Sequence, residues 1–211
     1  DLSSLGLIVY GAAPMAPDLL RRAIDAFGPV FLHLYGQSEA PQCVTTLRRV
    51  DHDLGKPERL GSCGRPTALC DVKLFDADMR EVAVGEPGEL CVRGPLVMAG
   101  YWRQPELTEQ AFHGGWLHTG DVARRDAEGF LYIVDRTKDM IISGGFNIYP
   151  REVEDALMAH HAVASAAVIG IPDEKWGEAV KAFVVLKSGA NNSAAELQAH
   201  VKEKRGAPWS P

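Results

Sequence analysis

The spacing of apolar residues changes twice along the 211-residue chain, and these changes limit its fold more than any other feature. Residues 5–10 form a short apolar run before a glycine turn, residues 17–27 repeat apolar side chains at helical spacing, and residues 30–35 return to a strand pattern. A strand, a helix and a strand in this order favour a parallel α/β layer. We expect this layer over about residues 1–50.

A different pattern follows from residue 61 to residue 134. Short strand-like runs at 71–75, 89–93 and 129–134 are separated by turns rich in glycine and proline. This pattern predicts a small antiparallel β subdomain over about residues 60–134.

A third pattern begins near Asp135, where a strand-like run at 140–142 precedes a glycine turn. The sequence then predicts a helix, two strands and a helix, at 150–160, 164–171, 179–186 and 193–204. We therefore expect α/β and α+β parts in two domains, the end of a larger domain at 1–134 and a small domain at 135–211. The carboxylates Glu152, Glu154 and Asp155 are expected to be solvated in the first turns of the helix.

The composition excludes several classes of function. A formal net charge of -6 leaves no basic face for a nucleic acid. The longest apolar stretch, 162–171, is half of the roughly 20 residues that a membrane span requires, so we expect none. The four cysteines form no CxxC pair and have no histidines at metal-ligand spacing, which is typical of packing residues in a reducing, cytoplasmic compartment.

Both ends of the chain have the character of internal sequence. An apolar run begins within the first residues without an initiator methionine, and residues 207–211 stop in a loop-like segment. We expect the chain to be part of a longer protein whose upstream domain is missing here.

Two segments follow predicted strands of the first layer. Tyr10–Pro14 is a turn of small residues, which either closes a strand-to-helix connection or brings the backbone close to a ligand. Tyr35–Glu39 offers an aromatic face, a glycine turn, a hydroxyl and a carboxylate. These groups suit a planar base, a phosphate oxygen and a divalent cation.

Gly36–Ala40 also differs from the nucleophile elbow GxSxG only in its last residue. A serine hydrolase is therefore a rival interpretation, with His118 or His160 as the base. It requires an acid and then a histidine downstream of Ser38.

Two later segments are rich in polar groups. Asp121 follows the turn at Gly114–Gly115, where it is either a turn or cap residue or a carboxylate that accepts both hydroxyls of a ribose. The charged cluster at 135–139 lies at the expected domain boundary, and the glycine-rich segment at 143–147 follows it. These residues are either a polar linker or a loop that admits a thin ligand.

Taken in this order, the segments resemble the adenylate-forming superfamily, which includes acyl-CoA synthetases, luciferases and peptide-synthetase adenylation domains. The runs that carry the resemblance are 115–121, 129–139, 142–150 and 152–154, with weaker likeness at 35–39, 88–94 and 100–102. The resemblance covers nearly the whole chain and is greatest to fatty-acid and medium-chain or aryl-acid CoA ligases. It implies a partial acyl-adenylate synthetase fold.

The resemblance also implies roles for individual residues. Tyr35 would stack on adenine, Ser38 would approach the α-phosphate and Glu39 would help to hold Mg²⁺. Asp121 and Arg136 would bind the ribose, and Asp135 would be the hinge of the small domain with the catalytic Lys138 beside it. The full set of implied nucleotide and coenzyme A contacts is Gly11, Ala12, Ala13, Tyr35, Gly36, Gln37, Ser38, Asp121, Ile133, Arg136, Ser143, Gly144, Gly145 and Phe146.

The implied activity is ATP-dependent conversion of a carboxylic acid, fatty or aryl, to an acyl-AMP and transfer of the acyl group to coenzyme A. Two parts of the family pattern are absent from the chain: the loop that grips the β- and γ-phosphates, and the lysine near the carboxyl terminus, which Lys202 and Lys204 do not replace. We therefore expect the chain alone to be inactive. A non-catalytic remnant or interaction module, and a peptide-synthetase adenylation domain, are the alternatives.

Overall fold

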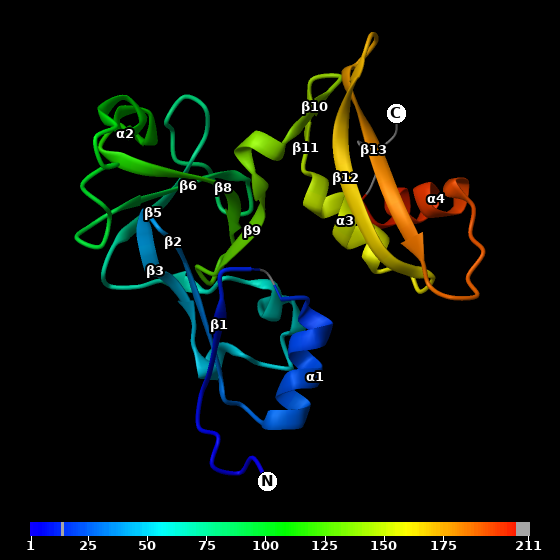
Figure 1. The fold of residues 1–211 in the computed structure, drawn as a ribbon, viewed down its shortest axis with the longest axis horizontal. Helices are drawn as coiled ribbons and strands as arrows, with labels where there is room; N and C mark the ends of the chain where they lie inside the picture. Colours follow the sequence, from blue (N-terminus) through cyan, green and yellow to red (C-terminus); the bar gives the residue numbers. More distant parts are fainter. Residues whose placement is uncertain (14, 206–211) are drawn as a thin grey trace. The chain divides into compact units, whose positions relative to one another are not determined.

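The computed structural model describes residues 1–13 and 15–205 (Figure 1). Pro14 of the predicted turn and residues 207–211 of the chain end lie outside the described residues. The chain divides into two compact units, of which the first is Asp1–Ile133 and the second begins at Val134. Among the described residues, no helix is long and apolar enough to cross a membrane.

The first sheet contains the predicted strand, helix and strand. Strands β1 (Ile8–Gly11) and β2 (Phe31–Gln37) are parallel, as predicted, and α1 (Pro17–Phe27) connects them. Proline occupies the first turn of α1, and Gly28 ends the helix with a φ of 80°. The buried face of α1 packs with the start of β2 in a small core whose buried members are Leu20, Ile24, Val30, Phe31 and Leu60.

Strands β3 (Ala40–Leu47) and β4 (Arg65–Pro66) complete this sheet in the order β1-β2-β3-β4. Strand β3 was not predicted from the sequence, because a proline and several polar residues obscure its strand pattern. β2 and β3 are antiparallel neighbours, so Ser38 and Glu39 lie in a hairpin turn. Two short 3₁₀ helices, Arg49–Asp51 and Pro57–Gly61, lie between β3 and β4 in the chain.

The second sheet is antiparallel, as predicted for this part of the chain. Its strands are β5 (Asp71–Phe75), β6 (Gly88–Arg93), β8 (Trp116–Arg125) and β7 (Phe112–His113) in this order, with β9 (Leu131–Arg136) also paired to β8. Helix α2 (Pro105–Ala111) precedes β7. A core joins residues of both sheets, including Val44, Leu74, Leu90, Leu117 and Leu131.

The second unit has its own sheet and core. The short 3₁₀ helix Thr137–Asp139 leads to β10 (Ile141–Ser143), β11 (Phe146–Ile148), β12 (Val163–Asp173) and β13 (Gly177–Leu186), which pair antiparallel in the order β11-β10-β13-β12. Helices α3 (Pro150–Met158) and α4 (Ala194–Arg205) contact each other and share a core with the sheet.

The first turns of α3 correct one expectation. Glu152 is buried, and Glu154 is half-buried and accepts a hydrogen bond from the Val168 amide at 2.8 Å, so neither carboxylate is freely solvated. Glu154 faces β12 and satisfies a backbone donor there. Asp155 is exposed, as expected.

The close approach of β3 to residue 64 gives a test of the fold. Gly64 has a φ of 92°, and a Cβ atom there would overlap the backbone carbonyl of Thr46. Gly64→Ala is expected to lower the free energy of unfolding by about 3 kcal/mol or more, because backbone must move.

Gly85→Ala is the matched control, since Gly85 has a φ of 90° but no atom within 4 Å of the added Cβ. It should lose only about 1 kcal/mol, the cost of a left-handed conformation. Urea unfolding of both variants measures the difference, and equal losses would contradict the described packing.

Candidate functional site

The carboxyl ends of β1 and β2 lie at the same edge of the first sheet, because the two strands are parallel. Gly11 pairs with Leu34, and a Cβ atom at residue 11 would overlap the Leu34 carbonyl, so only glycine fits there. Ala12 follows in the left-handed region, with a φ of 63°. The structure therefore brings the predicted segments Gly11–Ala13 and Tyr35–Glu39 to one edge.

Tyr35 and Asp121 meet at this edge. The Tyr35 hydroxyl donates a hydrogen bond of 2.6 Å to Asp121 Oδ2, and Asp121 is 6% exposed. Gln37 Nε2 donates to the Thr119 carbonyl oxygen at 3.5 Å. Burial, followed by the charge of Asp121, raises the pKa of Tyr35 well above its usual range. Two segments that are far apart in the sequence thus form one polar cluster.

Asp121 itself does not lie in a turn or at a helix cap. The glycine turn is at Gly114–Gly115, and Asp121 lies inside β8 at an irregularity in its pairing with β6. Glu89 pairs with Val122 but Cys91 pairs with His118, so β8 bulges between these pairs.

Hydrogen bonds from the hydroxyl group of Thr119 order the bulge. Thr119 Oγ1 donates to the Leu90 carbonyl oxygen at 2.6 Å and accepts from the Asp121 amide at 3.1 Å. Gly120 between them has a φ of 71°, which favours glycine. The bulge directs the Asp121 carboxylate toward Tyr35.

Glu39, the predicted Mg²⁺ ligand, is held by a residue that the sequence analysis did not identify. Tyr101 donates its hydroxyl to Glu39 Oε1 at 2.7 Å, and the hydrogen bond raises the pKa of Tyr101. The second carboxylate oxygen makes no hydrogen bond to the described residues, so it fits a hard cation that also binds phosphate oxygens. The family-like segment at 100–102 was the available signal for Tyr101.

The serine hydrolase interpretation is wrong. Ser38 is exposed in a turn between two strands, whereas a nucleophile elbow joins a strand to a helix. His118 Nε2, the nitrogen that would take the serine proton, is buried and makes no hydrogen bond to Ser38 or to any other described residue. His160 follows α3 in the second unit.

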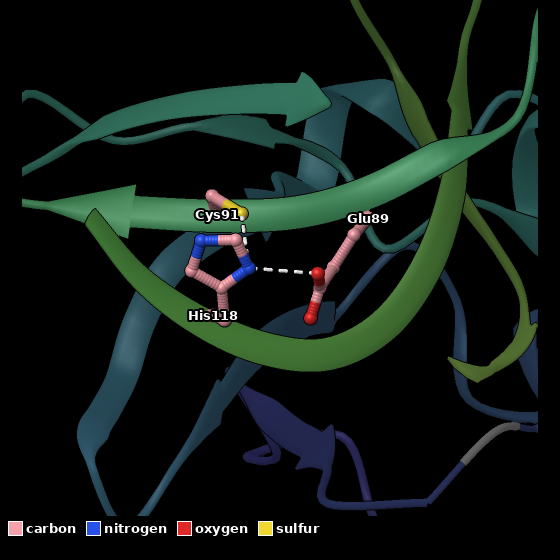
Figure 2. A group of neighbouring side chains, drawn as sticks. All are labelled: Glu89, Cys91 and His118. Atoms are coloured by element: carbon pink, nitrogen blue, oxygen red, sulfur yellow. Dashed lines mark hydrogen bonds and ion pairs between the residues drawn. The ribbon is translucent and has the colours of Figure 1, made fainter. Parts of the chain in front are cut away.

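Figure 2 shows the group formed by Glu89, Cys91 and His118. One potential ligand atom from each lies within 4.8 Å of the others, so their composition suits a metal ion. However, Glu89 Oε2 and His118 Nδ1 are only 2.7 Å apart, which is a direct hydrogen bond, whereas two ligands of one Zn²⁺ lie about 3 Å or more apart. Burial, with the charge of Glu89, raises the pKa of Cys91 to about 12, so its thiol is protonated. The geometry favours a hydrogen-bonded group.

The second unit contains the predicted hinge and its neighbours. The carboxylate of Asp135 is buried and accepts hydrogen bonds from the amides of Arg136, at 2.8 Å, and Arg151, at 2.9 Å. Asp135 is thereby fixed to the first turn of α3. Arg136 and Lys138 are exposed, and Ile133, in the first unit, packs against the core.

Ser143 and Phe146 pair across the turn between β10 and β11. Gly144 and Gly145 have φ angles of 58° and 83°, which suit the central positions of a tight hairpin. The Gly144 amide donates to the Trp176 carbonyl oxygen at 2.9 Å, and a Cβ atom on Gly144 would lie 2.7 Å from the Trp176 ring. Phe146 is 59% exposed beside this turn.

Two family models match the chain. The AMP-binding enzyme model matches residues 1–102, and the AMP-binding enzyme C-terminal domain model matches residues 152–211. The chain belongs to the AMP-binding enzyme family.

Curated relatives of this AMP-binding enzyme chain include two CoA-ligating proteins. The medium/long-chain-fatty-acid–CoA ligase FadD8 of Mycobacterium tuberculosis is 53% identical, over 100% of this chain and 38% of the relative. The feruloyl-CoA synthase of an Amycolatopsis species is 45% identical, over 97% of this chain and 40% of the relative. The chain therefore spans about two fifths of the length of these relatives.

Solved structures confirm the predicted fold class. The amide bond synthetase McbA from Marinactinospora thermotolerans superposes with a TM-score of 0.90 and 41% identity, over 100% of this chain and 43% of that one. The o-succinylbenzoate CoA synthetase of Bacillus subtilis, solved with its acyl-adenylate intermediate, gives 0.83 and 40%, over 98% and 41% of the two chains. The chain has a partial fold of the adenylate-forming enzymes.

The geometry of this AMP-binding enzyme chain links a matched segment to a residue outside both family matches. Gly11–Ala13 and Tyr35–Glu39 lie inside the first matched segment, whereas Asp121 lies between the two matches. The hydrogen bond from Tyr35 to Asp121 joins them in space.

The raised pKa of Tyr35 predicts a loss of stability at high pH. Unfolded Tyr35 loses its proton near pH 10, whereas the folded side chain keeps it, so stability is fully present below about pH 10 and falls above it. Between about pH 9 and about pH 11, the wild-type free energy of unfolding should fall more steeply than that of Tyr35→Phe. Urea unfolding at several pH values measures both slopes, and parallel slopes would contradict a raised pKa of the buried Tyr35 hydroxyl.

Proposed function

We propose that the chain is part of a cytoplasmic ATP-dependent acyl-CoA ligase, which converts a carboxylic acid to an acyl-AMP and transfers the acyl group to coenzyme A. The observation that carries this proposal is the pair formed by Tyr35 and Asp121 at the edge where Gly11–Ala13 also lies. It puts an aromatic ring, a buried carboxylate and close-approaching backbone together, which are the groups that an adenosine requires. The names of the CoA-ligating relatives agree with this assignment.

The nucleotide would contact residues of the first unit. Tyr35 would stack on the adenine, with Gly11–Ala13 along its edge, and Asp121 would accept hydrogen bonds from the ribose hydroxyls. Asp121 suits this role because its bulge fixes it and Tyr35 already orients its Oδ2 atom. Gly36, Gln37 and Ile133 would line the same site. The ribose contact of Arg136, which belongs to the second unit, rests on the family resemblance alone.

The first half-reaction joins two anions. A carboxylate oxygen of the acid attacks the α-phosphorus of ATP, the new bond makes the acyl phosphate, and the bond to pyrophosphate breaks. Such a reaction needs cations and hydrogen-bond donors near the developing charge. Glu39 would hold Mg²⁺ through the oxygen that Tyr101 does not engage, the exposed Ser38 hydroxyl would contact the α-phosphate, and Lys138 would supply positive charge.

The second half-reaction would use residues of the second unit. The coenzyme A thiol attacks the acyl carbonyl carbon, and AMP leaves. Asp135 would be the pivot, since its side chain is bound to α3 while the chain enters the unit beside it. The turn Ser143–Phe146 would border the pantetheine arm, and the exposed Phe146 offers it an apolar surface. Domain closure of this kind is a common way to separate two steps.

We infer that the chain alone is inactive, because it spans about two fifths of its relatives and an upstream domain would supply the phosphate-binding loop and most of the acyl pocket. The purified 211-residue chain should show no ATP–pyrophosphate exchange with any carboxylic acid. ATP–pyrophosphate exchange by this chain at the rate of the complete protein would show that no upstream domain is needed for the first half-reaction.

The complete protein tests the proposed function directly. It should catalyse ATP–pyrophosphate exchange that depends on a fatty or aryl acid, and form a thioester when coenzyme A is added. Asp121→Ala should lower kcat/KM for ATP by about 10- to 150-fold, the effect of losing roughly 1.5 to 3 kcal/mol of hydrogen bonding to a charged group.

The control variant is Asp78→Ala, which removes an exposed carboxylate whose partner is Arg80 on the surface. It should match wild type. Absence of acid-dependent exchange in the complete protein would favour the non-catalytic alternative. Exchange without a thioester would indicate an acceptor other than coenzyme A, such as an amine or a carrier protein.

A further inference from the structure

We propose that Glu89 is a positioning residue, which holds the β8 bulge in the conformation that presents Asp121 to the nucleotide. This inference rests on the proposed function and adds a residue that the sequence analysis did not assign to the site. Glu89 lies on β6, and the residues that it holds, His118 and Gly120, lie on β8.

One carboxylate spans the bulge. Glu89 Oε1 accepts a hydrogen bond from the Gly120 amide at 3.1 Å, and Oε2 lies 2.7 Å from His118 Nδ1 (Figure 2). The Gly120 amide lies in the part of β8 that has no regular pairing with β6, because the two strands are out of register there. Without Glu89 this donor would have to find water or remain unsatisfied at a partly buried position.

His118 is suited to hold the carboxylate in place. Its Nε2 atom is fully buried and makes no hydrogen bond to the described part of the chain. A proton on Nε2 would be a buried donor without an acceptor, so the tautomer with the proton on Nδ1 is favoured, and Nδ1 donates to Glu89. Cys91 Sγ lies 3.6 Å from His118 Nδ1, so the Nδ1 atom has contacts with both Glu89 and Cys91.

Through the bulge, the contact of Glu89 with Gly120 also fixes the position of the neighbouring Asp121. Gly120 stands between Thr119, which is bonded to the Leu90 carbonyl, and Asp121, which accepts from Tyr35. With the Glu89 contact, three consecutive residues of the bulge are fixed by hydrogen bonds, Thr119 and Gly120 to β6 and Asp121 to β2. Loss of one fixed point should displace the Asp121 carboxylate, and small displacements of binding groups weaken function strongly.

The test compares Glu89→Ala with Glu89→Gln in the complete protein. The alanine variant removes both acceptors and should raise KM for ATP about tenfold, with a smaller effect on kcat. The glutamine variant keeps an oxygen for the Gly120 amide but loses the acceptor of His118 Nδ1, and because the bulge depends on the Gly120 contact it should restore KM to within about threefold of wild type. Asp71→Ala is the matched control, because it removes an exposed carboxylate of the same sheet that pairs with Arg93, and it should leave KM unchanged.

Two further readouts separate positioning from general stability. In the Asp121→Ala background, Glu89→Ala should have little additional effect on KM, since both act on one contact. Amide hydrogen exchange of peptides that cover residues 118–121 should be faster in Glu89→Ala and near wild type in Glu89→Gln. Additive effects on KM, or unchanged exchange in Glu89→Ala, would overturn the proposal.

The exchange measurement needs no catalytic activity, so it decides the role of Glu89 even if the complete protein proves not to be a ligase. If Glu89→Ala fails to fold, Glu89→Asp replaces it, because its carboxylate is too short to reach both partners. A chelator that reproduces the Glu89→Ala effect, with recovery on adding Zn²⁺, would show that the group binds a metal ion and would also overturn the proposal.

Discussion

The hydrogen bond from Tyr35 to Asp121 is the contact on which the candidate site depends. It joins the end of β2 to the bulge of β8, segments that belong to different sheets of the first unit. A buried carboxylate is unfavourable unless donors surround it, so the bulge and the tyrosine hydroxyl are needed together. The remaining groups, from the backbone at Gly11 to Glu39 with its partner Tyr101, are arranged around the carboxyl ends of β1 and β2.

Features that depend on local sequence were predictable. Helix α1 has its predicted bounds, because apolar periodicity, a proline at the start and a glycine after the end all agree. Strand β5 is also as predicted. Features that depend on pairing between distant strands were not predictable from the sequence. Strand β3, for example, was missed because polar residues and a proline break its pattern. Asp121 was selected as a site residue, but its position in a strand bulge was not predicted, because the register of β6 and β8 creates that bulge.

The roles of Glu89 and Tyr101, which hold other site residues in place, were also not predictable from the sequence. Glu89 and Tyr101 lie in segments that resembled the family, yet nothing in the sequence shows that one holds the β8 bulge and the other holds Glu39. Those roles follow from cross-strand contacts. The roles proposed for Asp135, Lys138 and Ser143–Phe146 have a different basis, since they belong to a unit with its own core and rest on the family resemblance.

The measurement that tests the central claim most directly is calorimetric titration of the complete protein with AMP and with 2′,3′-dideoxy-AMP. If Asp121 binds the ribose hydroxyls, the wild-type protein should bind AMP more tightly than the dideoxy nucleotide by about 1.5 to 3 kcal/mol, and Asp121→Ala should lose most of this preference. A preference for AMP that persists in Asp121→Ala would contradict the account, as would a wild-type protein that does not distinguish the two nucleotides.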